Sequence, residues 1–338
     1  MTMRLTSILP LLALAPFISV QGAESATKGR FAIEASEAGA SITLDGQPFT
    51  TYNIHEANMP YLYPIIGPTG KSMTRAWPMQ DVEGEKQDHI HHRGLWFGHE
   101  SIGGYDTWAE EGTFKTPGKD GKVSEKSLER LKHLGKIQHR SFEKLEGGDK
   151  GVLVAVSDYV DQEGKKLIEE RRTFTFDATA DTRVIDVDLE LIATYGDVEI
   201  GDRKDAGLSI RVPHSMSADA GEGGRVINSE GQTDKEAWGK RARWCDFNGP
   251  VEGEKLGIAM LNHPSSFRYP TPWHARTYGL FTANPFGTSQ LNPEEEDGTL
   301  TLKEGESLQL HHRFIFHKGD ETQAGIEAAF KAYAAEVK

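Results

Sequence analysis

The 338-residue sequence contains a single cysteine, Cys245, so no disulfide can form within the chain. This excludes a small disulfide-stapled scaffold, and stability must come from a hydrophobic core. After residue 22 no apolar run approaches the roughly 20 residues of a membrane-spanning helix, so no membrane span is expected. Basic residues are also in deficit: 38 Lys and Arg face 51 Asp and Glu, a formal net charge of -13. Nucleic acid and anionic membrane surfaces repel such a protein and are not expected partners.

Several catalytic motifs are missing as well. The sequence has no Gly-x-Ser-x-Gly elbow, no His-Glu-x-x-His, and no Gly-x-Gly-x-x-Gly after a strand pattern. These absences argue against a serine hydrolase with that elbow, a zincin protease and a Rossmann dehydrogenase. Cys245, between Trp244 and Asp246, is interpreted as a small buried residue.

Residues 1–22 have the organisation of a secretory signal peptide. Arg4 precedes an apolar run from Ile8 to Ile18, and small and polar residues follow. The sequence therefore predicts an exported protein, periplasmic or extracellular. Residues 23–338 are expected to form one β-domain, because no strong linker and no internal repeat divides them.

Alternation of apolar and polar residues dominates the rest of the chain and is typical of β-strands. It is clearest at 184–191, and further strands are expected at 31–34, 41–49, 151–160, 167–176, 256–261, 278–283, 299–303 and 307–316. Asp45-Gly46 is a hairpin-turn signal within the first hairpin. Helical periodicity is convincing only at 321–336, and 110–127 and 218–240 are expected to be surface loops. These features predict an all-β antiparallel sandwich or barrel with a short C-terminal helix.

Four of the 13 histidines lie within residues 89–99. In an extended segment His89 and His91 would project to one face and His92 to the other. Two such imidazoles can bind a divalent metal such as Zn, Mn, Fe or Cu, with a third ligand from His99, Glu100 or a distant strand. His89 and His91 are therefore candidate metal ligands.

The same segment can work without a metal. Histidine titrates near neutral pH, so two imidazoles in different environments can donate and accept protons. Arg75 and Arg93 can hold hydroxyl or carboxylate oxygens in a fixed fork. Trp96 and Trp108 offer flat apolar faces of the kind on which sugar rings pack. This composition predicts a carbohydrate pocket.

Two later segments add candidate site residues. Residues 209–214 end a predicted strand with Arg211 and His214 near its tip, where a β-domain can direct them into a pocket. A loop rich in proline and polar residues, 262–276, contains His274 and is followed by 278–287, which contains Asn284.

The sequence resembles the exported bacterial family DUF6807, which is also labelled "methane oxygenase PmoA", over nearly the whole mature chain. The residues that carry the resemblance are Pro64, Thr74-Arg75, 88–97, Trp108, 211–214, 262–264, Trp273-His274 and 278–287. The methane monooxygenase subunit of that name is an integral membrane protein, whereas this sequence has no span after residue 22. The label therefore implies little about activity.

Arg75 followed by Asp88-His89-Ile90-His91 is also similar in order to the Arg and Asn-x-Leu-His elements of the galactose mutarotase family. That resemblance implies a large antiparallel β-supersandwich. It also implies His91 as the first active-site histidine, Arg75 as a substrate-binding arginine and His214 as the general acid. Mutarotases use a late glutamate as base, but the matching region here offers His274 or Asn284. This departure argues against simple mutarotation and leaves epimerisation, elimination or hydrolysis of a modified sugar open.

We therefore expect acid/base chemistry on a small-molecule or oligosaccharide substrate, with His91 and His214 as the catalytic pair and His274 as a further catalytic candidate. The expected substrate-binding residues are Arg75, Asp88, Arg93, Trp96, Trp108, Arg211 and Asn284. Two alternatives remain open. One is a metal-dependent enzyme or oxygenase that uses His89 and His91, and the other is a non-catalytic carbohydrate-binding protein.

Overall fold

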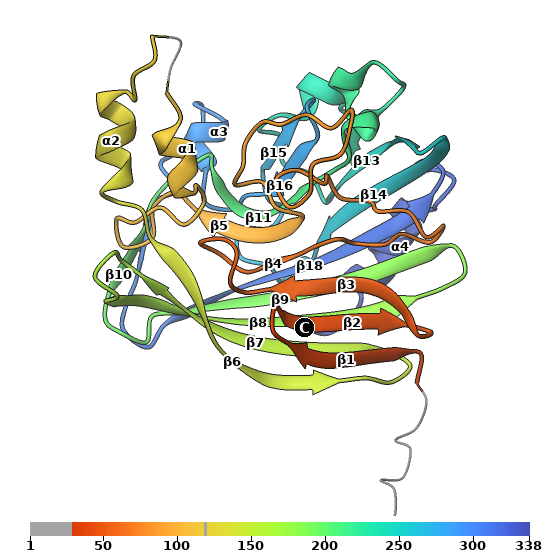
Figure 1. Cartoon of the computed structure of the whole chain (residues 1–338), viewed down its shortest axis with the longest axis horizontal. Helices are drawn as coiled ribbons and strands as arrows, with labels where there is room; N and C mark the ends of the chain where they lie inside the picture. Colours follow the sequence, from red (N-terminus) through yellow and green to blue (C-terminus); the bar gives the residue numbers. More distant parts are fainter. Residues whose placement is uncertain (1–28, 118–119) are drawn as a thin grey trace, which may run out of the picture.

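Two eight-stranded antiparallel sheets dominate the computed structural model, which describes residues 29–117 and 120–338. In Figure 1, β1, β2 and β3 lie in front of β7, β8 and β9, and α1, α2 and α3 lie together at the upper left. The expected all-β class is therefore confirmed. The predicted signal peptide at 1–22 falls outside the described residues.

The first sheet brings together strands from both halves of the chain. Its order is β1-β2-β3-β4-β5-β11-β16-β15. The strands are β1 (Phe31–Ser36), β2 (Gly39–Leu44), β3 (Gln47–Asn53), β4 (Tyr61–Leu62), β5 (Leu95–His99), β11 (Ala206–Arg211), β16 (Leu280–Ala283) and β15 (Trp273–Arg276).

The second sheet is built from longer strands. Its order is β12-β13-β14-β18-β9-β8-β7-β6. The strands are β12 (Arg225–Asn228), β13 (Trp244–Val251), β14 (Glu254–Asn262), β18 (Ser307–Lys318), β9 (Thr182–Ile192), β8 (Lys166–Ala178), β7 (Gly151–Val160) and β6 (Lys136–Glu146). A separate two-stranded sheet pairs β10 (Val198–Ile200) with β17 (Leu300–Leu302).

The expected single strand at 41–49 is wrong, because Asp45-Gly46 divides it into β2 and β3. Asp45 and Gly46 have φ of 51° and 78°, the pair of positive values that a tight type I′ hairpin turn requires. The β1–β2 hairpin turns earlier, at residues 37–38. The turn signal was therefore correct, but it belongs to the second hairpin of the chain.

The core lies between the two large sheets and is rich in aromatic side chains. Phe49 packs edge-on against Phe176 with ring centroids 5.8 Å apart, and Tyr52 packs against Phe174 at 5.5 Å. Alternation explains this burial: β9 turns its apolar residues inward and places Asp186 on the other face, where it pairs with Arg313.

The short elements correct two loop predictions. The 110–127 segment contains α1 (Glu111–Lys115) and the start of α2 (Glu125–Leu131), and 218–240 contains β12 and the 3-10 turns η2 (Ala218–Ala220) and η3 (Asp234–Ala237). The C-terminal helix α4 (Ile326–Ala334) begins five residues later than expected, directly after Gly325 at φ 68°. Its Phe330 and Tyr333 pack on β14 and β18. A further short helix is α3 (Thr288–Leu291).

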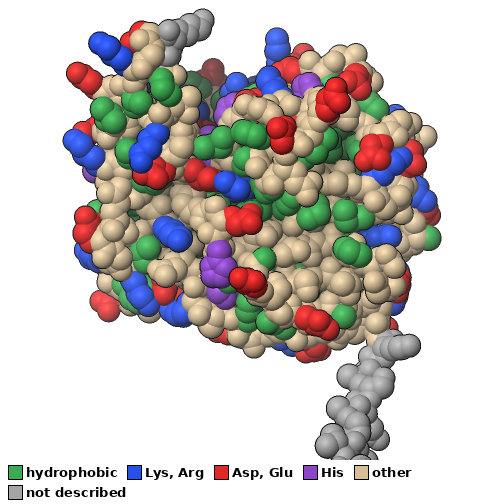
Figure 2. Space-filling view, in the orientation of Figure 1, with side chains coloured by type: hydrophobic (Ala, Val, Ile, Leu, Met, Phe, Trp, Pro, Cys, Tyr) green, Lys and Arg blue, Asp and Glu red, His purple; other side chains and the backbone are tan. Residues whose placement is uncertain are grey.

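Acidic and basic side chains are interspersed on the face seen in Figure 2. None of the helices in the described part of the chain is long and apolar enough to cross a membrane.

Candidate functional site

Residues from five separate segments line one cavity of about 480 Å³. The first segment is the loop before β5, and the second is the loop after β5 together with α1. The third is α2, the fourth is the turn that precedes β11, and the fifth is β15 with the turn that follows it. The lining residues are His89, His91, His92, Trp108, Ala109, Thr113, Arg130, Lys204, Asp205, His274, Arg276 and Tyr278.

The histidine segment is a turn and not the extended segment that the sequence analysis assumed. The His92 amide donates a hydrogen bond to the His89 carbonyl at 3.0 Å, and His89 has a φ of 41°. As a result His92 does not point away from the other two. Its ring stacks on His89 with centroids 4.7 Å apart and meets His91 edge-on at 4.5 Å.

Asp88 holds this turn in place by pairing with two buried arginines. Its Oδ1 lies 2.5 Å from Arg75 and 3.0 Å from Arg211. Arg75 also donates to the carbonyls of His89 and His92. Burial opposes ionisation of Asp88, but the His89 hydrogen bond and the two arginine charges lower its pKa overall. Arg75, Asp88 and Arg211, expected as substrate-binding residues, thus support the turn and do not line the cavity.

His91 is buried and its Nδ1 lies 3.0 Å from the Thr113 hydroxyl on α1. Burial lowers its pKa to about 3, and the neighbouring His89 charge acts in the same direction. His91 is therefore neutral near pH 7. Because a hydroxyl both donates and accepts, Thr113 is compatible with either tautomer of the ring.

His274 on β15 has a single allowed tautomer. Its Nδ1 lies 2.7 Å from the main-chain carbonyl of Lys204. A carbonyl only accepts, so Nδ1 carries the proton and Nε2 is left as an acceptor. Burial lowers the pKa of His274 to about 4. Asp205 Oδ1 lies 3.7 Å from the same Nδ1.

Aromatic rings form much of the rest of the wall. Trp108 lies nearly parallel to His274, with centroids 6.3 Å apart and an 11° angle between the rings. Tyr278 stacks on His89 at 5.1 Å. These flat faces lie beside the charged side chains of Arg130, Lys204, Asp205 and Arg276, so the cavity combines stacking surface with polar groups.

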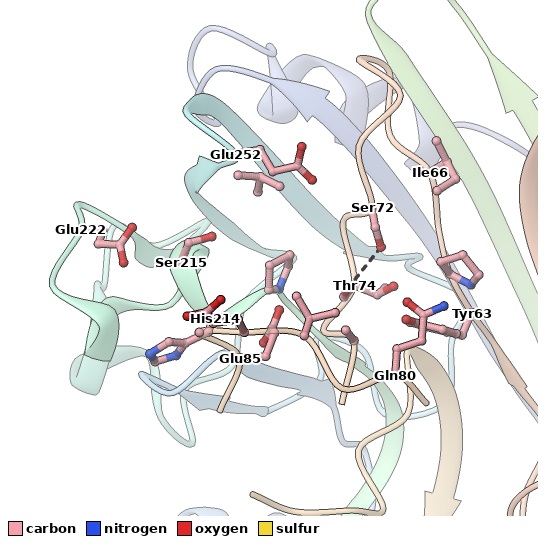
Figure 3. A pocket seen from close by; sticks show the side chains of 17 residues that line it. Tyr63, Ile66, Ser72, Thr74, Gln80, Glu85, His214, Ser215, Glu222 and Glu252 are labelled. Carbon is pink, nitrogen blue, oxygen red and sulfur yellow. Dashed lines mark hydrogen bonds between the residues drawn. The ribbon is translucent and has the colours of Figure 1, made fainter. Parts of the chain in front are cut away.

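His214 lies in a different cavity. It starts the 3-10 turn η1 (His214–Met216), into which the chain turns at Pro213 after β11. Figure 3 shows it near Glu85 in a space of about 540 Å³ that also includes Tyr63, Thr74 and Gln80. The structure therefore does not bring His91 and His214 together in one cavity.

The other expected binding residues lie behind the cavity wall. Arg93 makes two hydrogen bonds to Glu110, the residue that caps α1 and so positions Thr113. Trp96 is fully buried on β5 and stacks under His92 at 5.3 Å. Asn284 donates to the carbonyls of Arg203 and Lys204 at 2.9 and 3.0 Å, which fixes the turn that orients His274.

The expected metal-ligand set is incomplete in the structure. Among residues 29–117 and 120–338, no group of three or more His, Cys, Asp or Glu side chains has an arrangement that could hold a metal ion. The His89 and His91 centroids are 5.8 Å apart, and His89 Nδ1 lies 3.1 Å from Asp88. Neither proposed third ligand faces them: the His99 Nδ1 accepts from the Ser101 amide, and Glu100 pairs with Arg130.

Residues 39–331 match the family described as "Family of unknown function (DUF6807)". The chain belongs to this family. No curated protein matches the sequence.

Among solved structures, the DUF6807 chain is similar to a GH36 alpha-galactosidase from Geobacillus stearothermophilus, with 10% identity and a TM-score of 0.40. The match covers 88% of this chain but only 40% of that one. A putative aldose 1-epimerase from Escherichia coli K12 is similar with 12% identity and a TM-score of 0.31, over 86% of this chain and 96% of that one. A galactose mutarotase related enzyme from Lactobacillus acidophilus is similar with 9% identity and a TM-score of 0.26. That match covers 59% of this chain and 74% of that one.

Several cavity residues of this DUF6807 protein were not singled out from the sequence. Arg276 and Tyr278 follow His274 closely in the sequence. A basic and an aromatic side chain so near a candidate histidine were the available signal that they belong to a site. Thr113, Lys204 and Asp205 lie in polar stretches with no motif of their own, and only the folded chain places them beside the histidines.

Proposed function

We propose that this DUF6807 protein acts on carbohydrate by acid/base chemistry in the cavity that His91 and His274 line. The observation that carries the proposal is the pair itself: two buried imidazoles face one cavity, and one of them has its acceptor nitrogen fixed by the main chain. Acid/base catalysis requires such a positioned acceptor within reach of the substrate.

His274 is the proposed general base. Its Nε2 accepts a proton from the substrate, while Nδ1 keeps its hydrogen bond to the Lys204 carbonyl. The imidazolium that forms is stabilised by Asp205, whose carboxylate lies 3.7 Å from Nδ1. A neighbouring carboxylate that orients and stabilises a histidine base is a recurring arrangement in enzymes.

His91 is the proposed general acid, in place of the sequence-based pairing with His214. When the Thr113 hydroxyl donates to Nδ1, the ring proton resides on Nε2 and is available to a substrate oxygen. When the hydroxyl turns around, it accepts from Nδ1 of the other tautomer. Thr113 therefore keeps its hydrogen bond to either tautomer, and the proton that Nε2 gives to the substrate is replaced from solvent.

The cavity suits a sugar in size and in surface. Small-molecule sites commonly enclose about 300–1,000 Å³, and this one measures about 480 Å³. Trp108 and Tyr278 offer apolar faces for a ring, and Lys204 and Asp205 offer partners for hydroxyl groups. These features support a monosaccharide, or one residue of an oligosaccharide, as the ligand.

The test is proton exchange and turnover in deuterium oxide, followed by proton NMR over a panel of neutral, acidic and keto sugars. Wild-type protein should exchange a carbon-bound proton or convert at least one sugar. His274→Gln should lose about 100-fold or more of that rate, the usual contribution of a positioned base. His133→Gln, at an exposed histidine outside this cavity, is the matched control.

Two outcomes would contradict the proposal. Undiminished turnover by His274→Gln would show that His274 is not the base. Sugar binding with no turnover, and with affinity preserved in His91→Ala, would instead support the non-catalytic binding protein.

We also propose that residues 1–22 direct export and that the mature protein begins near residue 23. N-terminal sequencing of the protein recovered from a periplasmic fraction tests this. An intact Met1 in that fraction would contradict it.

A further inference from the structure

Arg276 differs from the other two cations that line the cavity. Arg130 pairs with Asp106 and Glu100 at 2.9 and 3.0 Å, and Lys204 pairs with Asp205 at 2.5 Å. Within residues 29–117 and 120–338, the Arg276 guanidinium makes no ion pair and no hydrogen bond to a side chain or carbonyl. Its five N–H donors are therefore available to a ligand.

Two aromatic rings hold the Arg276 guanidinium in a defined place. It lies 4.9 Å from the Trp238 ring centroid and 5.2 Å from the Tyr278 centroid. Stacking on aromatic faces orients a guanidinium while leaving its in-plane donors free, so less entropy is lost when an anion binds.

The position of Arg276 relative to the proposed base follows from the strand. His274 and Arg276 are two residues apart on β15, so their side chains project to the same face, and both line the cavity. A group held by Arg276 therefore lies on the same side of the strand as the nitrogen that accepts the proton.

Arg276 is the lining cation whose charge is not balanced in the described part of the chain. Arg130 is paired with Asp106 and Glu100, and Lys204 is paired with Asp205, the one carboxylate residue on the cavity lining. A sugar with only hydroxyl groups would leave the charge of Arg276 without a partner. A sugar carboxylate would complement it with a charge-assisted, two-pronged hydrogen bond.

We propose that the substrate is an acidic sugar of the uronic acid class, whose carboxylate is bound by Arg276 beside His274. The proposal rests on the proposed function, because it takes the His91–His274 cavity to be the sugar site.

The proposed substrate also defines the reaction. The C5–H bond of a uronic acid lies next to the carboxylate, and Arg276 would stabilise the charge that develops there. His274 Nε2 takes the C5 proton, and the electron pair of that bond moves onto the carboxylate. In elimination the C4–O bond then breaks, a C4=C5 double bond forms, and the departing oxygen takes the His91 Nε2 proton, which is replaced through solvent by the proton that His274 releases. In epimerisation C5 instead takes the His91 proton on its other face, and the proton held by His274 is released to solvent and restores His91.

The experiment compares matched neutral and acidic sugars by titration calorimetry. The probes are the methyl glycosides of galactose, glucose and mannose, each beside its uronic acid. Wild-type protein should bind one acid about ten-fold or more tightly than its neutral partner, since a charge-assisted bidentate contact contributes more than 1.4 kcal/mol. Arg276→Gln should bring the two affinities to within about two-fold, and Arg276→Lys, which keeps the charge without the fork, should fall between.

Arg171→Gln is the matched control, because Arg171 is a half-exposed arginine on β8 whose Nε pairs with Glu143, outside this cavity. It should keep the full preference for the acid. Thermal melting of each variant confirms that it is folded before affinities are compared.

The outcomes separate this inference from the proposed function. Equal affinity for neutral and acidic sugars, or a preference that survives in Arg276→Gln, would overturn the acidic-sugar assignment. Turnover of a neutral sugar that needs His274 would leave the proposed function standing and overturn this inference alone. Failure of every sugar in both series to bind would overturn both.

Discussion

The His274 ring donates its Nδ1 proton to the main-chain carbonyl of Lys204 over 2.7 Å. The same carbonyl accepts from Asn284, whose amide also reaches the Arg203 carbonyl. The orientation of the proposed base is therefore fixed by backbone that Asn284 holds. Asn284, expected from the sequence to bind substrate, is better described as a positioning residue.

Asn284→Ala should lower kcat more than it changes KM, because the Lys204 carbonyl would lose its second donor and the turn would shift under His274. Steady-state kinetics on the sugar found in the exchange screen measures this. Unfolding free energy should also fall by about 1–3 kcal/mol, because the Arg203 carbonyl and the amides of Phe286 and Gly287 would lose their Asn284 partner. Asn292→Ala, at a more exposed asparagine that does not line the cavity, should change neither. An effect on KM alone would point to direct substrate contact instead.

Asp88→Asn should destabilise the protein by about 3–5 kcal/mol, because removal of one partner leaves buried charges uncompensated. Arg75 and Arg211 are 0% and 1% exposed and both depend on the Asp88 carboxylate. Urea unfolding followed by tryptophan fluorescence measures the change. Asp81→Asn, at an exposed carboxylate bonded to Gln87, should stay within about 0.5 kcal/mol of wild type. A loss of less than about 1 kcal/mol in Asp88→Asn would refute the supporting role.

Stability should fall as pH falls from 7.5 to 5, because several buried histidines have low pKa values in the folded protein. Burial lowers the pKa of His274 to about 4. It lowers the pKa to about 3 in three further histidines, which are His91, His99 and His312. Below the unfolded value of about 6.5 the unfolded chain binds protons that the native state does not. Each such proton removes up to about 1.4 kcal/mol of stability per pH unit.

Three groups act in the opposite direction. Burial raises the pKa of Asp106 to about 6 and also raises the pKa of Glu85, and the pKa of His317 is raised by its Asp246 partner against the effect of burial. All three bind protons more tightly in the folded state, so their contribution is lost as pH rises. The four low-pKa histidines outnumber them, and urea unfolding at pH 7.5, 6 and 5 should show the net loss.

His312→Gln is the control for this pH dependence. His312 contacts Asn262 and does not line the cavity, so its replacement should make the stability curve shallower without altering sugar binding. A curve that is flat between pH 7.5 and 5 in the wild type would show that these histidines are not held neutral.

Chelation should leave the proton-exchange rate within about two-fold, because the proposed chemistry uses only the nitrogens of His91 and His274. The measurement is the rate before and after treatment with EDTA, together with elemental analysis of protein purified without a histidine tag. The His89→Ala/His91→Ala double variant is the companion sample. Near one equivalent of metal in the wild type, lost in this variant together with activity, would instead establish the metal-dependent alternative.

The sequence by itself determined many of the strands, although not β6 or β13, and indicated the chain segment that holds the proposed site. Alternation is local information, so residues 184–191 identify β9 and Asp45-Gly46 identifies a hairpin turn without any knowledge of their neighbours. The density of imidazoles in the 89–99 segment likewise pointed to the proposed site, since so many polar rings are costly to bury without a use.

Only the tertiary structure decided which residues meet in the cavity. β5 pairs with β11, which lies more than a hundred residues later in the chain, and β11 pairs with β16. The loops next to these strands are thereby brought together around the cavity. Arg211 thereby reaches Asp88 and fixes the histidine turn, whereas His214, three residues further along, is carried into another cavity. His274, and not His214, shares the cavity with His91 because long-range strand pairing and buried ion pairs, which no local pattern records, set these positions.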